Sequence, residues 1–391
     1  MRGNRDASPT LTPALYFASS VPLSRPKAGE GEFKWRAHRT QILFMPLTSK
    51  TAVLTAPRSF SIIDRTAPAL APDHVLVRIS ATAVCHTDLG IFKGLYSNLK
   101  YPVVMGHEST GIVEAAGEKV THVKTGDPVI INPIISCGHC DMCRREMQNL
   151  CRNAGLFGRE VDGSLSEFVH VAGKYIHPLP ADIALDDATI IETLATVKHA
   201  QDRLGVKAGD SVVIIGQGTT GLLHTQLAAL SGANPIIVIS RTQWKLDMAM
   251  RMGAHHVVDV GAEKALGEVM RLTANQGADV VIDTAGGAAT LAAAIEMLKP
   301  GGRLSPYAVS HECCTTFTTF PLYYKEISII GSRALSPSDM EPSIALVASG
   351  SIDVAGFVSA TYPLSRTAEA FEEYERNPGR VLRIVIDGRE S

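Results

Sequence analysis

Four cysteines within a 15-residue stretch offer the clearest chemistry in this 391-residue sequence. Cys137, Cys140, Cys143 and Cys151 follow the pattern C-x2-C-x2-C-x7-C. Four thiolates at such spacing can supply the closed, tetrahedral ligand set of a structural zinc ion. Two disulfide bonds, or thiols that share no role, are the alternatives. The number and spacing of the thiols favour zinc, since seven cysteines in all are too few for a disulfide scaffold in so long a chain.

A second group of metal-binding side chains is spread more widely along the chain. Cys85 opens the run Cys-His-Thr-Asp, and His107 lies in a Gly-His-Glu triplet that follows an expected strand. One thiolate and one imidazole leave a zinc ion in need of an oxygen ligand and a free position, which is typical of catalytic zinc. Glu108 and Glu192 are the candidates for the oxygen ligand, and water is the third choice.

A glycine-rich turn indicates a nucleotide site in the second half of the chain. Gly216, Gly218 and Gly221 form G-x-G-x-x-G between an apolar run and a helical pattern. The glycines allow a tight turn, close approach of a pyrophosphate and close helix packing, while the helix N-terminus presents N–H groups and a positive dipole. Together with Thr219 and Thr220 they predict a dinucleotide site, and a purely structural turn is the alternative.

The end of the next expected strand indicates which dinucleotide binds. A site specific for NAD normally places Asp or Glu there, because the carboxylate accepts a hydrogen bond from the ribose 2′-hydroxyl. This chain has Ser240 and Arg241 instead, with Lys245 one helical turn further on. No carboxylate at that position repels a 2′-phosphate, and two cations could bind it. We therefore predict a preference for NADP. The alternative is that Arg241 and Lys245 are solvated at the start of a helix and that the protein uses either NADP or NAD.

The elements that must position these residues are of two kinds. Up to about residue 195, short apolar runs alternate with Gly, Pro and Asp turns, which is typical of β-rich structure. Beyond residue 205, uniformly apolar strands alternate with amphipathic helices, as in a parallel sheet that is covered on both faces. Strands are expected at 211–215, 236–239, 257–260, 280–282 and 327–330 and near 304, with helices after the glycines and at 242–252, 263–275 and 288–298.

The pattern divides the chain into four segments. Residues 1–44 carry four prolines, seven basic side chains and three acidic ones, without a sustained period. We expect a disordered extension before a natural start at Met45, with a targeting peptide as the alternative. Residues 45–196 are expected to form a catalytic domain, residues 197–334 a doubly wound dinucleotide-binding domain, and residues 335–391 a return to the catalytic domain.

Charge and hydropathy argue against other classes of protein. The sequence has 37 Lys and Arg against 39 Asp and Glu, a net charge of −2, whereas nucleic-acid-binding domains usually carry a strongly basic face. No apolar run reaches the roughly 18 residues of a membrane span. Neither nucleic acid nor a membrane is therefore an expected partner. The adjacent Cys313 and Cys314 are expected to be buried thiols rather than a redox couple.

Taken together, the motifs resemble those of the zinc-dependent medium-chain alcohol dehydrogenases over about residues 50–388. This resemblance implies a GroES-like, β-rich catalytic domain and a Rossmann domain, hence an α/β fold, with the active site in the cleft between them. It rests on the Cys85 turn, the run Gly106-His107-Glu108-x2-Gly111-x5-Gly117-x2-Val120, the four-cysteine lobe, Asp162-Gly163 before Glu167-Phe168, and the glycine-rich turn.

The resemblance also implies catalytic roles. A zinc ion held by Cys85, His107 and a glutamate would act as a Lewis acid on the oxygen of the alcohol. Thr87 would take the proton of the alcohol through a hydrogen bond and pass it on. Asp88 would orient His107 through the second ring nitrogen and so select the tautomer that binds zinc.

Three positions indicate the subgroup within this family. Glu192 replaces a ligand cysteine, which resembles the polyol (sorbitol-type) dehydrogenases, although Thr193 departs from their usual proline. Gly90 replaces a histidine that commonly relays the proton, so the relay would be shorter or would use water or the cofactor ribose. Ser240 and Arg241 resemble the NADP-using bacterial secondary-alcohol members.

We therefore expect a cytoplasmic oxidoreductase with one catalytic and one structural zinc ion per chain. It would transfer a hydride between a primary or secondary alcohol, including polyols, and NADP(H), with an aldehyde or ketone as the other reactant. A homodimer or homotetramer is expected. The alternatives are an NAD-dependent polyol or threonine-type dehydrogenase, a zinc-free quinone reductase, and a catalytically silent protein that binds zinc and nucleotide.

Overall fold

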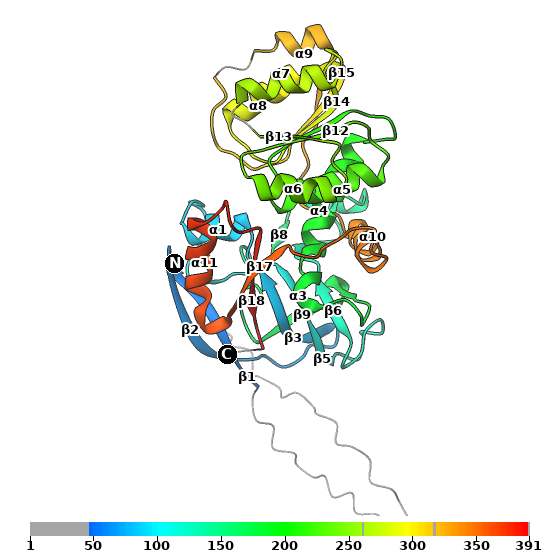
Figure 1. Ribbon diagram of the computed structural model, residues 1–391. Coiled ribbons are helices and arrows are strands. Elements are labelled where there is room, and N and C mark those ends of the chain that lie inside the picture. Colours follow the sequence, from blue (N-terminus) through cyan, green and yellow to red (C-terminus); the bar gives the residue numbers. More distant parts are fainter. Residues whose placement is uncertain (1–46, 260–261, 316–317, 390–391) are drawn as a thin grey trace, which may run out of the picture.

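The computed structural model describes residues 47–259, 262–315 and 318–389, and the predicted extension 1–44 lies outside them. The chain forms two lobes (Figure 1). A lobe rich in strands contains the first and last described residues, and an α/β lobe is built from the middle of the chain. The expected α/β fold, with a β-rich part and a doubly wound part, is confirmed.

The β-rich lobe is organised by a seven-stranded sheet with the order β10-β6-β5-β3-β18-β17, in which β9 also pairs with β3. The central strand β3 (His74–Ala83) is apolar and mostly buried. It pairs antiparallel with β5 (Glu108–Ala116), β9 (Phe168–Ala172) and β18 (Arg383–Asp387). Ala83 of β3 is the register partner both of Glu108 and of Val385. The last strand of the chain is thereby placed beside the Gly-His-Glu triplet.

The remaining elements of this lobe are mostly short. Strands β2, β1 and β4 form a three-stranded sheet, and β7 pairs with β8. The strands are β1 (Thr48–Ala56), β2 (Ser59–Thr66), β4 (Val103–Val104), β6 (Pro128–Ile131), β7 (Ile134–Ile135), β8 (Gly155–Leu156), β10 (Ile176–Pro178) and β17 (Val358–Pro363), and the helices are α1 (His86–Phe92), α2 (Asp141–Arg144), α3 (Leu185–Ala188) and α11 (Thr367–Arg376).

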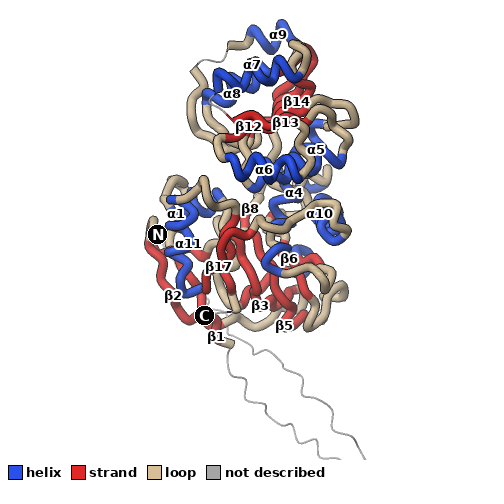
Figure 2. The backbone as a smooth tube through the Cα atoms, viewed as in Figure 1, coloured by secondary structure: helices blue, strands red, loops and turns tan. Residues whose placement is uncertain are grey.

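The α/β lobe contains a six-stranded parallel sheet with the order β13-β12-β11-β14-β15-β16. Helices α5 and α6 lie on one side of it and α7 and α8 on the other (Figure 2), so the central strands need apolar residues on both faces. The elements are β11 (Val212–Ile215), β12 (Ile236–Ser240), β13 (His256–Asp259), β14 (Ala278–Asp283), β15 (Leu298–Pro306), β16 (Ser328–Ile329), α5 (Thr219–Leu230), α6 (Gln243–Arg251), α7 (Ala262–Leu272), α8 (Ala288–Met297) and α9 (Phe320–Lys325).

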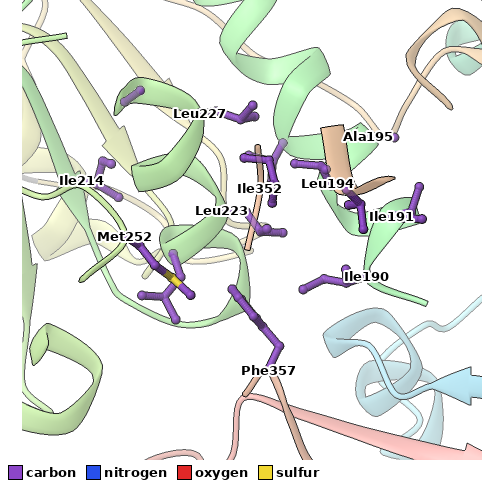
Figure 3. Packing of buried hydrophobic residues seen from close by; sticks show 14 of the residues in the cluster. Ile190, Ile191, Leu194, Ala195, Ile214, Leu223, Leu227, Met252, Ile352 and Phe357 are labelled. Carbon is purple, nitrogen blue, oxygen red and sulfur yellow. The ribbon is translucent and has the colours of Figure 1, made fainter. Parts of the chain in front are cut away.

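Helix α4 (Ile190–Leu204) and helix α10 (Pro337–Ala348) lie at the junction of the lobes (Figure 1). Ile191 and Leu194 of α4 share one buried cluster with Leu223 of α5 and with Phe357 from the segment before β17 (Figure 3). Because this core is continuous, it fixes α4 against the nucleotide-side helix α5. Glu192, in the first turn of α4, is held in place by the same packing.

Two details differ from the sequence-based expectation. Helix α7 ends at Leu272 rather than at residue 275, because Ala274 and Asn275 adopt left-handed φ values of 51° and 61°. Cys313 is exposed, so the prediction of two buried thiols is wrong: the pair lies in the loop after β15 and not in the core. None of the described helices is both long and apolar enough to cross a membrane.

Candidate active site and zinc-binding lobe

The start of helix α1 brings three predicted active-site residues together. Cys85 is the N-cap residue, and its backbone N–H donates to Oδ2 of Asp88 over 3.2 Å. The other Asp88 oxygen, Oδ1, lies 3.2 Å from Nδ1 of His107, and both side chains are buried. Burial alone would lower the pKa of His107, but the Asp88 carboxylate outweighs it and the pKa lies well above its usual value. Since Nδ1 faces Asp88, Nε2 is the ring nitrogen left for a metal ion.

Three different donor atoms converge beside this helix. The Cys85 thiol, a His107 ring nitrogen and a Glu108 carboxylate oxygen all lie within 4.8 Å of one another. Burial, with the Glu108 carboxylate, raises the pKa of the Cys85 thiol. Thr87, in the first turn of α1, is half-buried, and its hydroxyl has no hydrogen-bond partner among the described residues. The arrangement offers sulfur, nitrogen and oxygen to one ion, with a hydroxyl nearby.

A buried arginine that is not among the residues predicted from the sequence lies beside Glu108. Arg383 of β18 is 3% exposed and forms an ion pair with the Glu108 carboxylate. Its guanidinium group also donates to the carbonyl oxygen of Thr189 over 2.7 Å and to Oγ1 of Thr193 over 3.1 Å. The available signal was an arginine inside the apolar run Val381–Ile386, because a charge in a buried strand needs a buried partner.

Glu192 approaches the same site from helix α4. Its side chain is 5% exposed and lies outside the 4.8 Å cluster of donor atoms. Burial, with the nearby Glu108 carboxylate, raises the pKa of Glu192 to about 8, although the charges of His107 and Arg383 act in the opposite direction. The structure thus brings both candidate oxygen ligands to the site, with Glu108 inside the donor cluster and Glu192 beside it.

Removing the positive charge of Arg383 is expected to destabilise the protein. Arg383→Met should lower the free energy of unfolding by about 3–5 kcal/mol, because the Glu108 carboxylate remains buried without its counter-charge. Urea unfolding of the metal-free protein, followed by circular dichroism, measures this. The double variant Glu108→Gln/Arg383→Met should recover part of the loss. Arg376→Met is the control, since Arg376 forms an exposed pair with Glu372 and should change stability by no more than about 1 kcal/mol. Equal losses for both arginines would contradict the assignment.

The four predicted zinc-binding cysteines meet around helix α2. The Sγ–Sγ distance is 3.5 Å for the pairs Cys140–Cys143 and Cys137–Cys151, and 3.9 Å for Cys137–Cys143 and Cys140–Cys151. All four are free cysteines. Four sulfurs placed about 2.3 Å from one zinc ion in a tetrahedron would lie roughly 3.8 Å apart. Backbone N–H groups of Arg152 and Cys143 lower the pKa of Cys140 to about 6. The spacing and the stabilised thiolate fit a zinc site.

The glycine-rich turn connects β11 to helix α5. Gly216 has a φ of 91°, and a Cβ atom at Gly221 would lie 2.0 Å from the carbonyl oxygen of Gly216, so these positions require glycine. A Cβ atom at Gly218 would meet no atom within 4 Å, which leaves open space above the turn. Thr220 is half-buried at the helix start, whereas the Thr219 hydroxyl donates to the carbonyl oxygen of Leu382 over 2.9 Å. Thr219 can therefore offer its backbone N–H to a ligand.

The predicted cofactor-selecting residues follow β12. Ser240 ends this strand, and its register partner on β13 is Asp259, which is exposed. Arg241 is exposed as well. Lys245 is 7% exposed, and its Nζ donates to the carbonyl oxygens of Pro378 over 2.8 Å and of Val381 over 3.3 Å. The Lys245 ammonium group is thus bound by the main chain before β18, and Arg241 is the cation that remains at the strand end.

Two tyrosines near the site gave no signal in the sequence. The Tyr374 hydroxyl of α11 lies 2.8 Å from Nδ1 of His86. The Tyr307 hydroxyl, directly after β15, lies 2.7 Å from Oγ1 of Thr196 on α4. Burial, with the nearby carboxylate of Glu192, raises the pKa of Tyr307. Tyr307 therefore links the carboxyl end of the nucleotide sheet to the helix that carries Glu192.

Comparisons with known proteins agree with this geometry. Residues 71–181 match the alcohol dehydrogenase GroES-like domain, and residues 219–349 match the zinc-binding dehydrogenase domain. The D-arabitol-phosphate dehydrogenase of Enterococcus avium is 31% identical over 328 residues, which cover 83% of this chain and 93% of that protein. The sorbitol dehydrogenase of Bacillus subtilis is 28% identical over 346 residues, with coverage of 88% and 98%.

Solved structures share the arrangement of both lobes. A zinc-binding dehydrogenase from Sinorhizobium meliloti 1021, determined with NADP bound, superposes with a TM-score of 0.80 at 30% identity. The match covers 87% of this chain and 99% of that structure. The chain is an oxidoreductase, and it belongs to the zinc-dependent medium-chain alcohol dehydrogenase family.

Proposed function

We propose that this oxidoreductase transfers a hydride between a polyol and NADP(H), with one zinc ion at the Cys85–His107 cluster and a second in the four-cysteine lobe. The observation that carries the proposal is the convergence of sulfur, nitrogen and oxygen donors from Cys85, His107 and Glu108 within 4.8 Å. Glu192 adds a second buried carboxylate. A divalent cation would offset the repulsion between two carboxylates that share one low-dielectric site.

The side chains around the donor cluster have distinct tasks in this proposal. Zinc would act there as a Lewis acid on the substrate oxygen, and the nicotinamide would accept the hydride. Asp88 holds Nδ1 of His107, which keeps Nε2 available. Arg383 holds the Glu108 carboxylate in place. The unbonded Thr87 hydroxyl can accept the hydrogen bond of the substrate hydroxyl and take its proton while passing its own proton on to water or to the cofactor ribose.

Polyols are the proposed substrates because two independent features agree. Glu192 stands on α4 where a carboxylate typical of polyol dehydrogenases is expected. The relatives from Enterococcus avium and Bacillus subtilis are named as dehydrogenases of D-arabitol phosphate and sorbitol. A screen of alcohols, polyols, aldehydes and threonine with both nicotinamide cofactors tests this proposal. Turnover restricted to simple monohydric alcohols would overturn the polyol assignment, and binding of cofactor without any turnover would favour the catalytically silent alternative.

The cofactor preference is expected to follow Arg241. One charge-assisted hydrogen bond to the 2′-phosphate contributes about 1.5–3 kcal/mol, and each 1.4 kcal/mol is tenfold. NADP should therefore be preferred by about 10- to 100-fold in kcat/KM. Arg241→Ala should remove most of this preference, and Ser240→Asp should reverse it by repelling the phosphate and accepting from the 2′-hydroxyl of NAD. The measurement is kcat/KM for both cofactors on each variant.

Asp259 supplies the control for this experiment. Its exposed carboxylate is one strand away from Ser240 and could favour NAD. If the wild type prefers NADP, Asp259→Asn should leave the order of the two cofactors unchanged. A wild type that prefers NAD, and loses that preference in Asp259→Asn, would refute the role of Arg241 and support the NAD-dependent alternative.

We further infer a homodimer or homotetramer in the cytoplasm. Strand β16 lies at the edge of the parallel sheet, and Tyr323 and Tyr324 of the preceding helix are 82% and 72% exposed. A sheet edge with exposed aromatic side chains beside it favours association. The free thiols required as zinc ligands favour a reducing compartment. Sedimentation at several protein concentrations measures the oligomeric state, and a monomer throughout would contradict the first inference.

A further inference from the structure

A cavity of about 480 Å³ lies in the β-rich lobe, between the chain segment after α1 and the turn before Gly163. The cavity is lined by polar side chains to an unusual degree for a substrate pocket. Those that matter here are Tyr96, Asn98 and Lys100 on one side, and Arg159, Glu160 and Asp162 on the other. None of these residues belongs to the zinc or nucleotide sites described above.

Two glycines show how the segments that form the cavity pack against the segments that carry the proposed metal-binding residues. A Cβ atom at Gly90, in the helix that begins after Cys85, would lie 2.9 Å from Cε2 of Tyr96. A Cβ atom at Gly158 would lie 2.7 Å from the backbone nitrogen of Gly106, the residue before His107. Both walls of the cavity therefore pack directly on the segments that carry the metal-binding residues. An extended molecule with its reacting hydroxyl at that cluster could reach the cavity with its far end.

The cations of the cavity are placed to bind an anion. Nε of Arg159 donates to Oε1 of Glu160 over 2.7 Å, and the guanidinium carbon lies 5.9 Å from the ring centre of Tyr96. The terminal Nη groups of Arg159 and the ammonium group of Lys100 have no hydrogen-bond partner among the described residues. The guanidinium fork is thus oriented, with its outer donors free for a planar or tetrahedral anion.

The carboxylates in the cavity already have partners. Oε2 of Glu160 accepts from the backbone N–H of Leu156 over 2.8 Å. Oδ2 of Asp162 accepts from Arg65 over 2.7 Å, and Oδ1 accepts from the backbone N–H of Val104 over 3.2 Å. Lys100 and Arg159 therefore balance the charges of the two carboxylates in the cavity lining, and Arg65 pairs with Asp162 from β2. Because both carboxylates are already bound, the free donor groups of Arg159 and Lys100 favour an anionic ligand.

We propose that this cavity binds the phosphate group of a phosphorylated sugar alcohol, with Arg159 and Lys100 as the phosphate ligands. The inference rests on the proposed polyol dehydrogenase function and makes the substrate class specific. Arg159 binds two phosphate oxygens through its Nη groups, Lys100 adds a point charge, and Asn98 lies where it can donate to a substrate hydroxyl. The cavity then sets which end of the polyol faces the donor cluster.

Steady-state kinetics with D-arabitol phosphate and D-arabitol tests the proposal. The wild type should show a kcat/KM at least about 10-fold higher for the phosphate ester. Arg159→Ala should lower kcat/KM for the ester by about 10- to 100-fold, as expected for loss of a charge-assisted, bidentate contact, and by much less for D-arabitol. Arg159→Lys should recover part of the loss, because the charge stays and the fork is lost. Arg271→Ala is the matched control, since Arg271 forms an exposed pair with Glu268 on α7, outside the cavity and outside both zinc sites, and it should leave kcat/KM for both substrates unchanged.

Calorimetric binding separates this proposal from the function on which it rests. If neither compound is oxidised but D-arabitol phosphate binds to the wild type and not to Arg159→Ala, the proposed function fails and the phosphate site stands. If both compounds are oxidised with equal kcat/KM, or if Arg159→Ala weakens both equally, the phosphate site is refuted. Inorganic phosphate is the third probe. If inorganic phosphate competes with D-arabitol phosphate and binds as tightly, the polyol chain contributes nothing to the affinity. That result would also overturn the assignment of the cavity as a substrate subsite.

Discussion

Replacing Cys85 with serine is expected to abolish turnover while the fold stays intact. The thiol lies within 4.8 Å of its partner donor atoms on His107 and Glu108, and a serine hydroxyl is a far weaker zinc ligand. Loss of the ion removes several kcal/mol of stabilisation of the developing charge, so kcat should fall by about 1000-fold or more. Because Cys85 is not part of the apolar core, the melting temperature should stay within a few degrees of the wild type, as expected for a change below about 1 kcal/mol.

Turnover, zinc content and circular dichroism on the same preparations measure this effect. The wild type should contain two zinc ions per chain and Cys85→Ser one. Cys313→Ser is the control, because Cys313 is exposed and lies outside both clusters. It should match the wild type in all three measurements. An active wild type with fewer than two zinc ions per chain, or a fully active Cys85→Ser variant, would contradict the proposed catalytic site.

Replacing Cys137 with serine should have the opposite effect to replacing Cys85, because it should destabilise the fold rather than act on turnover alone. The lobe around Cys137 contains only short elements, α2 and a few turns, and its four sulfur atoms lie 3.5–3.9 Å apart. Such a segment has little apolar core of its own, so the zinc ion supplies much of its folding free energy. A loss of about 3–5 kcal/mol would lower the melting temperature by roughly 10 °C in a chain of this size.

Thermal unfolding with and without a chelator distinguishes this role from catalysis. Chelation should lower the melting temperature of the wild type and have little further effect on Cys137→Ser. Cys85→Ser provides the comparison, since it also loses one zinc ion but keeps its stability. If Cys137→Ser melts like the wild type and only activity is lost, the four-cysteine lobe is not a structural zinc site.

The sites that could be predicted most specifically from the sequence are formed by residues close together in the chain. Cys137 and Cys151 are separated by 14 positions, so a few turns bring the four sulfurs together almost regardless of the rest of the fold. The glycine-rich turn is equally local: its requirement arises from the contact between Gly221 and the Gly216 carbonyl, within six residues. The parallel sheet was predictable as well, because uniformly apolar strands between amphipathic helices have few other ways to be buried.

Residues far apart in the chain could be brought into one site only by the tertiary structure. Arg383 meets Glu108 because β3 pairs with β5 on one side and with β18 on the other, across a separation of 275 positions. Lys245 was predicted beside Arg241 from helical spacing, but its long side chain turns to the carbonyl oxygens of Pro378 and Val381, which no local pattern reveals.

The family, the metal-binding residue types and the nucleotide turn were predictable without a structure, since each depends on residue identity and short spacing. Three features could be read only from the three-dimensional arrangement: which carboxylate lies inside the donor cluster, which cation remains free at the end of β12, and that Arg159 and Lys100 line one cavity. The physical reason is that these outcomes depend on side-chain direction and on burial between distant segments. A strand or helix period predicts which face of an element is buried, but the partner across that face is supplied by another part of the chain.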